Sequence, residues 1–273
     1  MATKRITVKT IEVMKKSGEA IVALTAYDFH TARMEAEAGV HIILVGDSFQ
    51  MAVLGKNTTL GAEMDVLVSH CKAVKEGAPD TLVVADMPFG SYQPSSELAV
   101  KNAVRFIAEA GADAVKLEGG NEAASSRVKA IVDAGIPVMG HIGLLPQSIK
   151  QAGVYRVVRA DSEDLLKTQL KALEDAGAFS VVLEMIEEDV ATRLTEVSSI
   201  ATIGIGAGRY TDGQILVVND MLGMNSSFNP KFLKKYADMH SIMKNAFACY
   251  VEEVSGGVFP GEKNVFKGRG KNR

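Results

Sequence analysis

The stretch His41-Ile42-Ile43-Leu44-Val45-Gly46-Asp47-Ser48 decides the fold. Its large apolar residues run without interruption into Gly-Asp-Ser, which is typical of a parallel strand that is buried on both faces. Such a strand delivers its last polar residues, here Asp47 and Ser48, to one edge of a sheet. Residues 81–86 and 114–118 have the same form, because each is an apolar run that ends at or near an acid.

Eight apolar segments of strand length follow one another, and amphipathic segments of helical pattern separate most of them. The strands are expected at residues 20–28, 41–47, 81–86, 114–118, 137–142, 180–185, 201–206 and 214–218. Eight strands that alternate with helical crossovers predict a (β/α)8 TIM barrel, an α/β fold with a parallel sheet. The alternative is an open doubly wound sheet, because residues 207–213 leave no room for a full helix between the last two strands.

Helices are also expected at both ends of the chain. Residues 7–17 predict a short helix that closes one end of the barrel, and about residues 231–254 predict a long helical stretch. We expect residues 1–262 to form a single barrel domain and residues 263–273 to form a basic, disordered tail. The loop over about residues 143–160 is longer than a compact barrel requires, which indicates a lid or a substrate-binding loop.

Composition narrows the class of protein. The 273 residues carry 30 Lys+Arg against 33 Asp+Glu, and this balance gives no indication of a nucleic-acid or membrane partner. No apolar run approaches the roughly 20 residues of a membrane span, and the N-terminus lacks a signal-peptide pattern. Cys71 and Cys249 lie in predicted helices, outside any CxxC or Cys/His cluster. We interpret them as buried free thiols in a reducing compartment and expect a cytoplasmic protein.

Three acids are expected at the mouth of the barrel. The carboxyl ends of all strands face this mouth, where active sites are found, and it would receive Asp47, Asp86 and Glu118. Three carboxylates held together repel one another unless a cation compensates their charge. Oxygen ligands without thiolates suit a hard ion such as Mg²⁺. The alternative for any one of these acids is that it caps the loop or helix that follows.

Other polar residues are expected at the same mouth. Lys116 lies two residues before Glu118 on the same strand face, so it would bind a substrate carboxylate or form a salt bridge with an interior acid. His141 would hydrogen-bond a substrate oxygen as a neutral imidazole, or have a structural role. Glu184 is the only charged group of its strand, and burial would raise its pKa and make it a better general base. The alternative is a buried glutamate neutralised by Lys116 or Arg209.

The segment Gly204-Ile205-Gly206-Ala207-Gly208 is similar to a glycine-rich anion loop, although it lacks the spacing of a dinucleotide or P-loop motif. Its glycines serve equally well in close packing or a tight turn. The residues alone indicate a Mg²⁺-dependent barrel enzyme. The metal would chelate a 2-oxo acid, and Glu184 would remove an adjacent proton.

Together these motifs resemble the ketopantoate hydroxymethyltransferase (3-methyl-2-oxobutanoate hydroxymethyltransferase) family. The resemblance runs in order, almost without gaps, from about residue 3 to residue 262. The segments that carry it are Leu24-Thr25-Ala26-Tyr27-Asp28, Val45-Gly46-Asp47-Ser48, Ala85-Asp86-Met87-Pro88-Phe89, Val115-Lys116-Leu117-Glu118-Gly119-Gly120, Gly140-His141-Ile142-Gly143-Leu144, Leu183-Glu184, Gly204-Ile205-Gly206-Ala207-Gly208, Thr211-Asp212-Gly213-Gln214-Ile215-Leu216-Val217 and Pro260-Gly261-Glu262.

The resemblance implies the first step of pantothenate (vitamin B5) and coenzyme A biosynthesis. A hydroxymethyl group would move from the co-substrate 5,10-methylenetetrahydrofolate to 3-methyl-2-oxobutanoate and give ketopantoate. The resemblance assigns Mg²⁺ to Asp47, Asp86 and Glu118, the oxo acid to Asp47, Ser48, Asp86, Lys116 and His141, and the proton of C3 to Glu184. It also implies a (β/α)8 barrel that assembles as a homodecamer.

The chain departs from the family pattern in the long loop. Leu144-Leu145-Pro146-Gln147 stands where Leu-Thr-Pro-Gln is usual, and residues 153–159 also differ, which concerns the closure of the loop rather than the chemistry. Two other functions stay open: a carbon–carbon lyase or mutase of the related Mg²⁺ barrels, and a non-catalytic barrel that binds a metabolite. The lyases and mutases usually offer a loop cysteine, whereas Cys71 and Cys249 lie in predicted helices. No local motif assigns the folate contacts.

Overall fold

The computed structural model describes residues 5–153 and 156–266. Within these residues eight parallel strands form a closed barrel in sequence order, and the last strand pairs with the first. The strands are β1 (Ile21–Thr25), β2 (Ile42–Val45), β3 (Leu82–Asp86), β4 (Ala114–Lys116), β5 (Val138–Gly143), β6 (Ser180–Glu184), β7 (Ala201–Ile205) and β8 (Gly213–Leu216). The predicted (β/α)8 barrel is confirmed, and the open doubly wound sheet is excluded.

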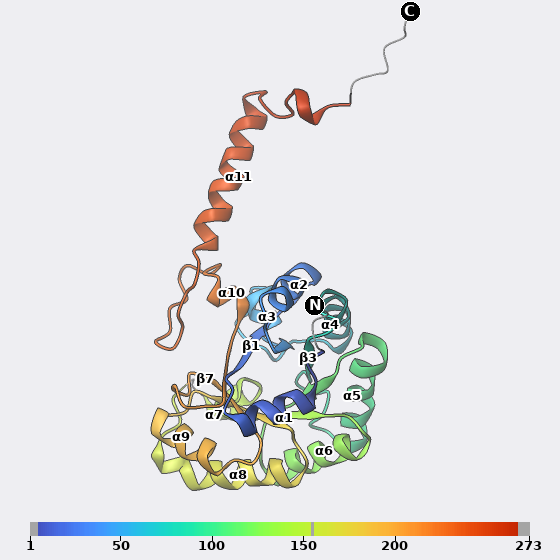
Figure 1. Ribbon diagram of the computed structural model, residues 1–273, viewed down its shortest axis with the longest axis vertical. Coiled ribbons are helices and arrows are strands. Elements are labelled where there is room, and N and C mark those ends of the chain that lie inside the picture. Colours follow the sequence, from blue (N-terminus) through green and yellow to red (C-terminus); the bar gives the residue numbers. More distant parts are fainter. Residues whose placement is uncertain (1–4, 154–155, 267–273) are drawn as a thin grey trace, which may run out of the picture. The chain divides into compact units, whose positions relative to one another are not determined.

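Helices alternate with the strands and surround them (Figure 1). They are α2 (Phe29–Glu37), α4 (Met64–Gly77), α5 (Ser96–Ala110), α6 (Glu122–Asp133), α8 (Glu163–Asp175) and α9 (Glu188–Val197). In α5 the buried residues Ala99 and Phe106 lie two turns apart on one face. Ser95 caps this helix by accepting a hydrogen bond from the amide of Leu98, and Gly111 ends it with a φ of 72°. Local sequence signals therefore set these boundaries.

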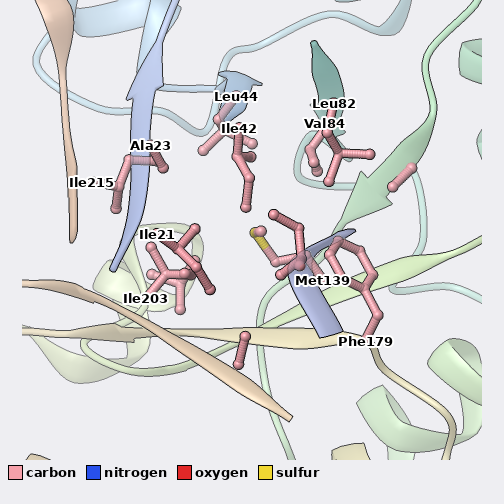
Figure 2. Close-up of a cluster of buried hydrophobic side chains, with 14 of the residues drawn as sticks. Ile21, Ala23, Ile42, Leu44, Leu82, Val84, Met139, Phe179, Ile203 and Ile215 are labelled. Atoms are coloured by element: carbon pink, nitrogen blue, oxygen red, sulfur yellow. The ribbon is translucent and has the colours of Figure 1, made fainter. Parts of the chain in front are cut away.

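The core fills the amino-terminal half of the barrel. Helix α1 (Val8–Ser17) contributes Ile11 and Met14 to a buried apolar cluster that includes Ile21 and Leu82, the first residues of β1 and β3. Figure 2 shows side chains from several strands meeting in this cluster. The expected N-terminal helix is confirmed, and its apolar face packs where the strands begin. The polar ends of the strands are left for the opposite mouth.

The barrel closes between β7 and β8 without a crossover helix. This connection was the weak point of the sequence prediction, and it contains no helix in the structure. Closure depends on Gly213, where an added Cβ would lie 2.4 Å from the carbonyl oxygen of Ile21 and 2.8 Å from the side chain of Ile203. Because glycine has no side chain, the three strands can approach one another here.

Short helices lie in the connections. They are α3 (Phe49–Ala52), η1 (Pro146–Ser148), α7 (Ile149–Ala152), η2 (Ala160–Ser162), α10 (Val218–Met221) and η3 (Glu262–Asn264). The long loop after β5 therefore contains regular structure of its own, which its length alone did not predict. Residues 154–155 of this loop lie outside the described residues. No helix in the described part of the chain is long and apolar enough to span a membrane.

The chain divides into two compact units. The first is the barrel, which runs to Val218 and includes Lys231–Leu233, and the second comprises Asn219–Pro230 and the chain from Lys234 onward. The second unit contains α11 (Met239–Ser255). Contacts alone do not measure independent folding, so the single domain over residues 1–262 stays a prediction.

The C-terminal helix starts later than its apolar pattern indicated. We expected it from about residue 231, but Asp238 caps α11 by accepting a hydrogen bond from the backbone amide of Ser241. None of the residues of α11 is buried, and Cys249 on this helix is an exposed free thiol, so the expected burial is confirmed for Cys71 and wrong for Cys249. Residues 267–273 of the expected tail lie outside the described residues.

Candidate active site

The three predicted acids lie on neighbouring strands at one mouth of the barrel. Asp86 is the last residue of β3, whereas Asp47 and Glu118 each follow the last residue of their strand by two positions. The register pairs Asp86 with Lys116 across β3 and β4. The acids are 4%, 2% and 6% exposed for Asp47, Asp86 and Glu118. Gly46 permits the turn after β2, because an added Cβ would lie 2.7 Å from Ser48 Oγ.

The acids affect one another electrostatically. Burial raises the pKa of Asp47 well above its ordinary value, and the nearby charges of Asp86 and Glu118 raise it further. The backbone amide of Asp47 donates to Asp86 Oδ2 at 3.3 Å, so β2 and β3 are connected at this point. Negative charge is therefore crowded at the mouth, and this crowding contributes to the raised pKa of Asp47.

Lys116 is the cation that these acids share. Its Nζ donates to both oxygens of Asp86, at 2.8 and 3.0 Å, and both side chains are buried. Burial lowers the pKa of Lys116, but Asp86 and Glu118 outweigh it and hold the pKa above the ordinary lysine value. The salt bridge to an interior acid, one of the two expected roles, is what the structure contains. Contact with a substrate carboxylate stays a prediction.

His141 on β5 lies between two glutamates. Its Nδ1 is 3.6 Å from Glu118 Oε1, and its Nε2 is 3.2 Å from Glu184 Oε2. Burial and Lys116 lower the pKa of His141, but the two adjacent carboxylates outweigh them and raise it to about 9. These surroundings favour a protonated imidazole over the expected neutral one. Neither contact has hydrogen-bonding geometry, so the interaction is mainly an attraction between opposite charges.

Glu184 is the last residue of β6, and its side chain is 20% exposed. This is less burial than the apolar strand predicted. Its partner is His141 and neither of the two cations considered from the sequence. Lys116 pairs with Asp86, and Arg209 pairs with Glu188 at 2.7 Å. The carboxylate is therefore held beside an imidazolium and open to the mouth.

The glycine-rich segment after β7 serves local packing. The backbone amide of Arg209 donates to Glu188 Oε2 at 2.9 Å, so a carboxylate of the same chain already accepts this amide. An added Cβ on Gly208 would lie 2.5 Å from Glu188 Cγ. The glycines allow the turn and the close approach of Glu188, which favours the packing role over an anion loop.

Ser48 is positioned by an aromatic neighbour. Its hydroxyl lies 2.8 Å from the hydroxyl of Tyr27, which follows β1. The ring of Tyr27 lies 6.0 Å from that of Phe49, whose ring in turn lies 4.3 Å from that of His70. Asp86 thus holds the backbone of Asp47, and Tyr27 holds the hydroxyl of Ser48.

Sequence reasoning missed Gln147 and Tyr92. Gln147 Nε2 donates to Asp47 Oδ2 at 2.9 Å, and its backbone amide donates to Glu118 Oε2 at 3.0 Å. Tyr92 donates its hydroxyl proton to Gln147 Oε1 at 2.7 Å. The available signals were the unusual length of the loop and Pro146 at the start of its helical turn. They do not reveal contacts between residues 100 positions apart.

The donors at the mouth fit a hard divalent cation. Asp47, Asp86 and Glu118 supply only carboxylate oxygens, and together with Glu184 they outnumber the two cations Lys116 and His141. Among the residues described, no three His, Cys, Asp or Glu side chains are grouped as a ready metal site, so the three-ligand site stays a prediction. The acids are instead connected to Lys116 and Gln147. The site therefore fits a divalent cation by the type of its donors and by its excess of acids over cations.

Solved structures share the fold at low sequence identity. The phosphonopyruvate hydrolase complex with oxalate and Mg²⁺ superposes with a TM-score of 0.63 at 12% identity, over 95% of this chain and 91% of that chain. A 2,3-dimethylmalate lyase of the PEP mutase/isocitrate lyase superfamily superposes with a TM-score of 0.57 at 14% identity, over 88% and 98%. At such identities the likeness concerns the fold alone.

Sequence relatives are much closer. The chain is 52% identical over 264 residues to the 3-methyl-2-oxobutanoate hydroxymethyltransferase of Clostridium beijerinckii, over 96% of this chain and 95% of that protein. It is 53% identical over 254 residues to the enzyme of the same name from Pseudothermotoga lettingae, over 92% and 96%. The model of the ketopantoate hydroxymethyltransferase family matches residues 5–262. The resemblance seen in the motifs is confirmed, and the chain belongs to the ketopantoate hydroxymethyltransferase family.

Proposed function

We propose that the protein transfers a hydroxymethyl group from 5,10-methylenetetrahydrofolate to 3-methyl-2-oxobutanoate, giving ketopantoate and tetrahydrofolate. This is the first step of pantothenate and coenzyme A biosynthesis. One observation carries the proposal. The acid cluster and Glu184 meet at one mouth, where His141 lies within 3.6 Å of Glu118 and 3.2 Å of Glu184. The acid cluster suits an oxo acid with its cation, and Glu184 suits proton removal.

The acid side of the mouth would hold the cation and the oxo acid. Asp47, Asp86 and Glu118 are the proposed ligands of Mg²⁺, and the excess of buried negative charge supports this assignment. Bound Mg²⁺ supplies a Lewis acid that stabilises the negative charge developing on a substrate oxygen. Lys116 and Ser48 would contact the oxo acid, since both present donors at the ends of their strands.

Glu184 would accept the proton from C3 of the oxo acid. Its side chain is open to the mouth, and its carboxylate lies 3.2 Å from Nε2 of His141. A carboxylate within reach of an acidic C–H acts as a general base, with a typical contribution of 10²–10⁴-fold in rate. With Mg²⁺ bound, His141 would lie close to the oxo acid, between the proposed ligand Glu118 and the proposed base Glu184.

Assembly and location belong to the same proposal. We expect a homo-oligomer, a decamer by family resemblance, in the cytoplasm. Exposed apolar side chains on α11 support an assembly, because large exposed apolar patches mark contact surfaces. They are Ile242, Phe247, Tyr250, Val251 and Val254. Multi-angle light scattering on the purified protein checks the mass of the assembly, and a monomer would contradict it.

The function is tested by following C3 of 3-methyl-2-oxobutanoate in D₂O by NMR. With Mg²⁺ alone, the protein should exchange the C3 proton for deuterium. Addition of 5,10-methylenetetrahydrofolate should produce ketopantoate. Release of pyruvate or glyoxylate from other acids would indicate the lyase or mutase alternative. Oxo-acid binding without exchange or turnover would indicate a metabolite-binding barrel.

A further inference from the structure

The loop after β5 is attached at both ends to the segment that carries Glu184. The amide of Leu144 donates to the carbonyl of Glu184 at 2.9 Å, and the amide of Val158 donates to the carbonyl of Met185 at 2.7 Å. The amide of Glu187 returns a hydrogen bond to Val158 at 2.9 Å. Both ends of the loop are therefore fixed beside the proposed base.

The middle of the same loop reaches the acid cluster through Gln147, which is 3% exposed. Besides Asp47, its Nε2 donates to the carbonyl of Met87 at 3.0 Å. Its Oε1 accepts from the hydroxyl of Tyr92 at 2.7 Å and from Gln93 Nε2 at 3.0 Å. The side chain thus uses two donors and two acceptor positions.

This pattern allows one orientation of the amide. If the amide were flipped, Oε1 would face the Asp47 carboxylate and the Met87 carbonyl, so two pairs of acceptors would repel each other. Its Nε2 would then face two donors, one from Tyr92 and one from Gln93. The surroundings therefore fix the direction in which Gln147 donates, and this direction is towards Asp47.

Tyr92 supports Gln147 from the opposite side. Its hydroxyl accepts a hydrogen bond from the backbone amide of Glu118 at 3.1 Å while it donates to Gln147. Its carbonyl accepts from Nε of Arg127 on α6 at 2.7 Å. Gln147 is therefore held between the loop and a rigid element of the barrel, which is how a positioning residue keeps an acid in place.

A neutral amide suits this position because of the charge balance. A carboxylate here would repel Asp47 and Glu118. A lysine would neutralise the negative charge that a cation is to balance. The side-chain amide of Gln147 donates to Asp47 and its backbone amide donates to Glu118, and neither contact changes the total charge of the acids. The acids then keep fixed positions and full affinity for a divalent ion.

We propose that Gln147 is a positioning residue for the cation site. Its side chain holds Asp47 in the orientation that binds a divalent ion, its backbone amide contacts Glu118, and together these contacts fasten the middle of the loop to the acids. The inference rests on the proposed function, because it takes the two acids to be metal ligands. Two consequences follow. Loss of the amide weakens metal affinity, and it frees the middle of the loop.

The test compares Gln147→Met with the wild type and with Ser148→Ala. Methionine has a similar length and no hydrogen-bonding amide, and Ser148 lies in the same turn with a side chain that caps no helix. Mn²⁺ binding is measured by electron paramagnetic resonance. We expect the dissociation constant of Gln147→Met to rise about 10- to 100-fold, as for other outer partners of metal ligands. Ser148→Ala should match the wild type.

Hydrogen exchange gives a second readout without metal. The backbone amides of residues 144–150 should exchange faster in Gln147→Met than in Ser148→Ala. In turnover assays, saturating Mg²⁺ should restore most of the activity of Gln147→Met, which it would not do for a misfolded protein. If Gln147→Met fails to fold, Tyr92→Phe removes one support of the amide and should weaken Mn²⁺ binding by a smaller factor.

Two results would overturn the inference. A folded Gln147→Met variant that binds Mn²⁺ as tightly as the wild type would remove Gln147 from the cation site and leave the proposed function intact. A wild type that binds no Mn²⁺ would instead remove the cation site from the proposed function, and this inference would fall with it.

Discussion

The two ends of the barrel both hold acids, but in opposite states of charge balance. At the amino-terminal end, Asp113 precedes β4 and pairs with Lys75 at 2.6 Å and Arg5 at 3.0 Å. Asp212 precedes β8 and pairs with Lys15 at 2.8 Å. At the other mouth, Asp47, Asp86, Glu118 and Glu184 share Lys116 and His141. Each of these acids at the amino-terminal end has at least one cationic partner, whereas four acids at the mouth share two cations.

The difference shows that the role of an acid depends on whether it precedes or follows its strand. An acid before a strand lies at the end that α1 closes, where it can be paired for stability. An acid after a strand lies at the open mouth, where conserved architecture of such barrels places the chemistry. Asp212 also accepts hydrogen bonds from the amide and hydroxyl of Thr202. We therefore expect changes at the two ends to have separable effects.

The largest effect is expected from Glu184→Gln. The amide cannot accept the C3 proton, so deuterium exchange at C3 should fall on the order of 10²–10⁴-fold. Mn²⁺ affinity should be unchanged, because Glu184 is not among the proposed ligands. Glu188→Gln, which removes the partner of Arg209, is the matched control. Unchanged exchange in Glu184→Gln would exclude it as the base.

A smaller effect, on binding, is expected from Asp86→Ala. This change removes a proposed ligand and leaves the buried Lys116 without its salt bridge. Affinity for both Mg²⁺ and the oxo acid should fall by at least about 10-fold, on the scale of a lost charged contact. Isothermal titration measures both affinities. If they match those of the wild type, Asp86 does not belong to the site.

At the amino-terminal end of the barrel, Asp212→Asn should affect stability alone. It breaks the ion pair with Lys15, of which both side chains are largely buried. The free energy of unfolding should fall by about 3 kcal/mol, the lower end of the range for buried pairs that lose one partner. Urea denaturation measures this loss. A change in Mn²⁺ affinity as large as that of Asp86→Ala would refute the separation of the two ends.

The smallest effect concerns Glu35 on α2, which belongs to neither set of acids at the two ends of the barrel. Its oxygens are buried and make no hydrogen bond within the described residues, and burial raises its pKa to about 8, with a further contribution from Asp28. The folded state keeps the proton that the unfolded state releases above its ordinary pKa of 4.5. Stability should therefore fall as pH rises from about 5 to about 8.

Between pH 6 and pH 7 the loss from Glu35 should be about 1 kcal/mol. Glu35→Gln should remove this slope, and urea denaturation at several pH values measures it. Glu37→Gln, a change at an exposed position of the same helix, should keep the slope. Equal slopes in the wild type and Glu35→Gln would show that Glu35 does not hold its proton in the folded state.

Much of the barrel could be predicted because its signals are local. A buried parallel strand is an apolar run, and an acid at its carboxyl end can be read directly, as for Asp47 and Asp86. Helix boundaries follow from single residues such as Ser95 and Gly111. The closure beside Gly213 could not be predicted, because it depends on contacts with Ile21 and Ile203 on two other strands.

The charge state of the site could be predicted less well. The protonation of His141 depends on Glu118 and Glu184 from other strands, and the sequence around His141 does not reveal them. Gln147 reaches Asp47 only because the loop after β5 turns back over the mouth. Residue type and strand position thus predicted which acids gather, whereas their partners depend on the folded loops.

The central claim is that the cation and the oxo acid bind at the mouth that is short of positive charge. A crystal structure with Mg²⁺ and ketopantoate tests it most directly. The account predicts an ion about 2.0–2.1 Å from carboxylate oxygens of Asp47 and Asp86. It also predicts that C3 of ketopantoate faces Glu184. An ion or ligand bound at the amino-terminal end, beside Asp212 or Asp113, would contradict it.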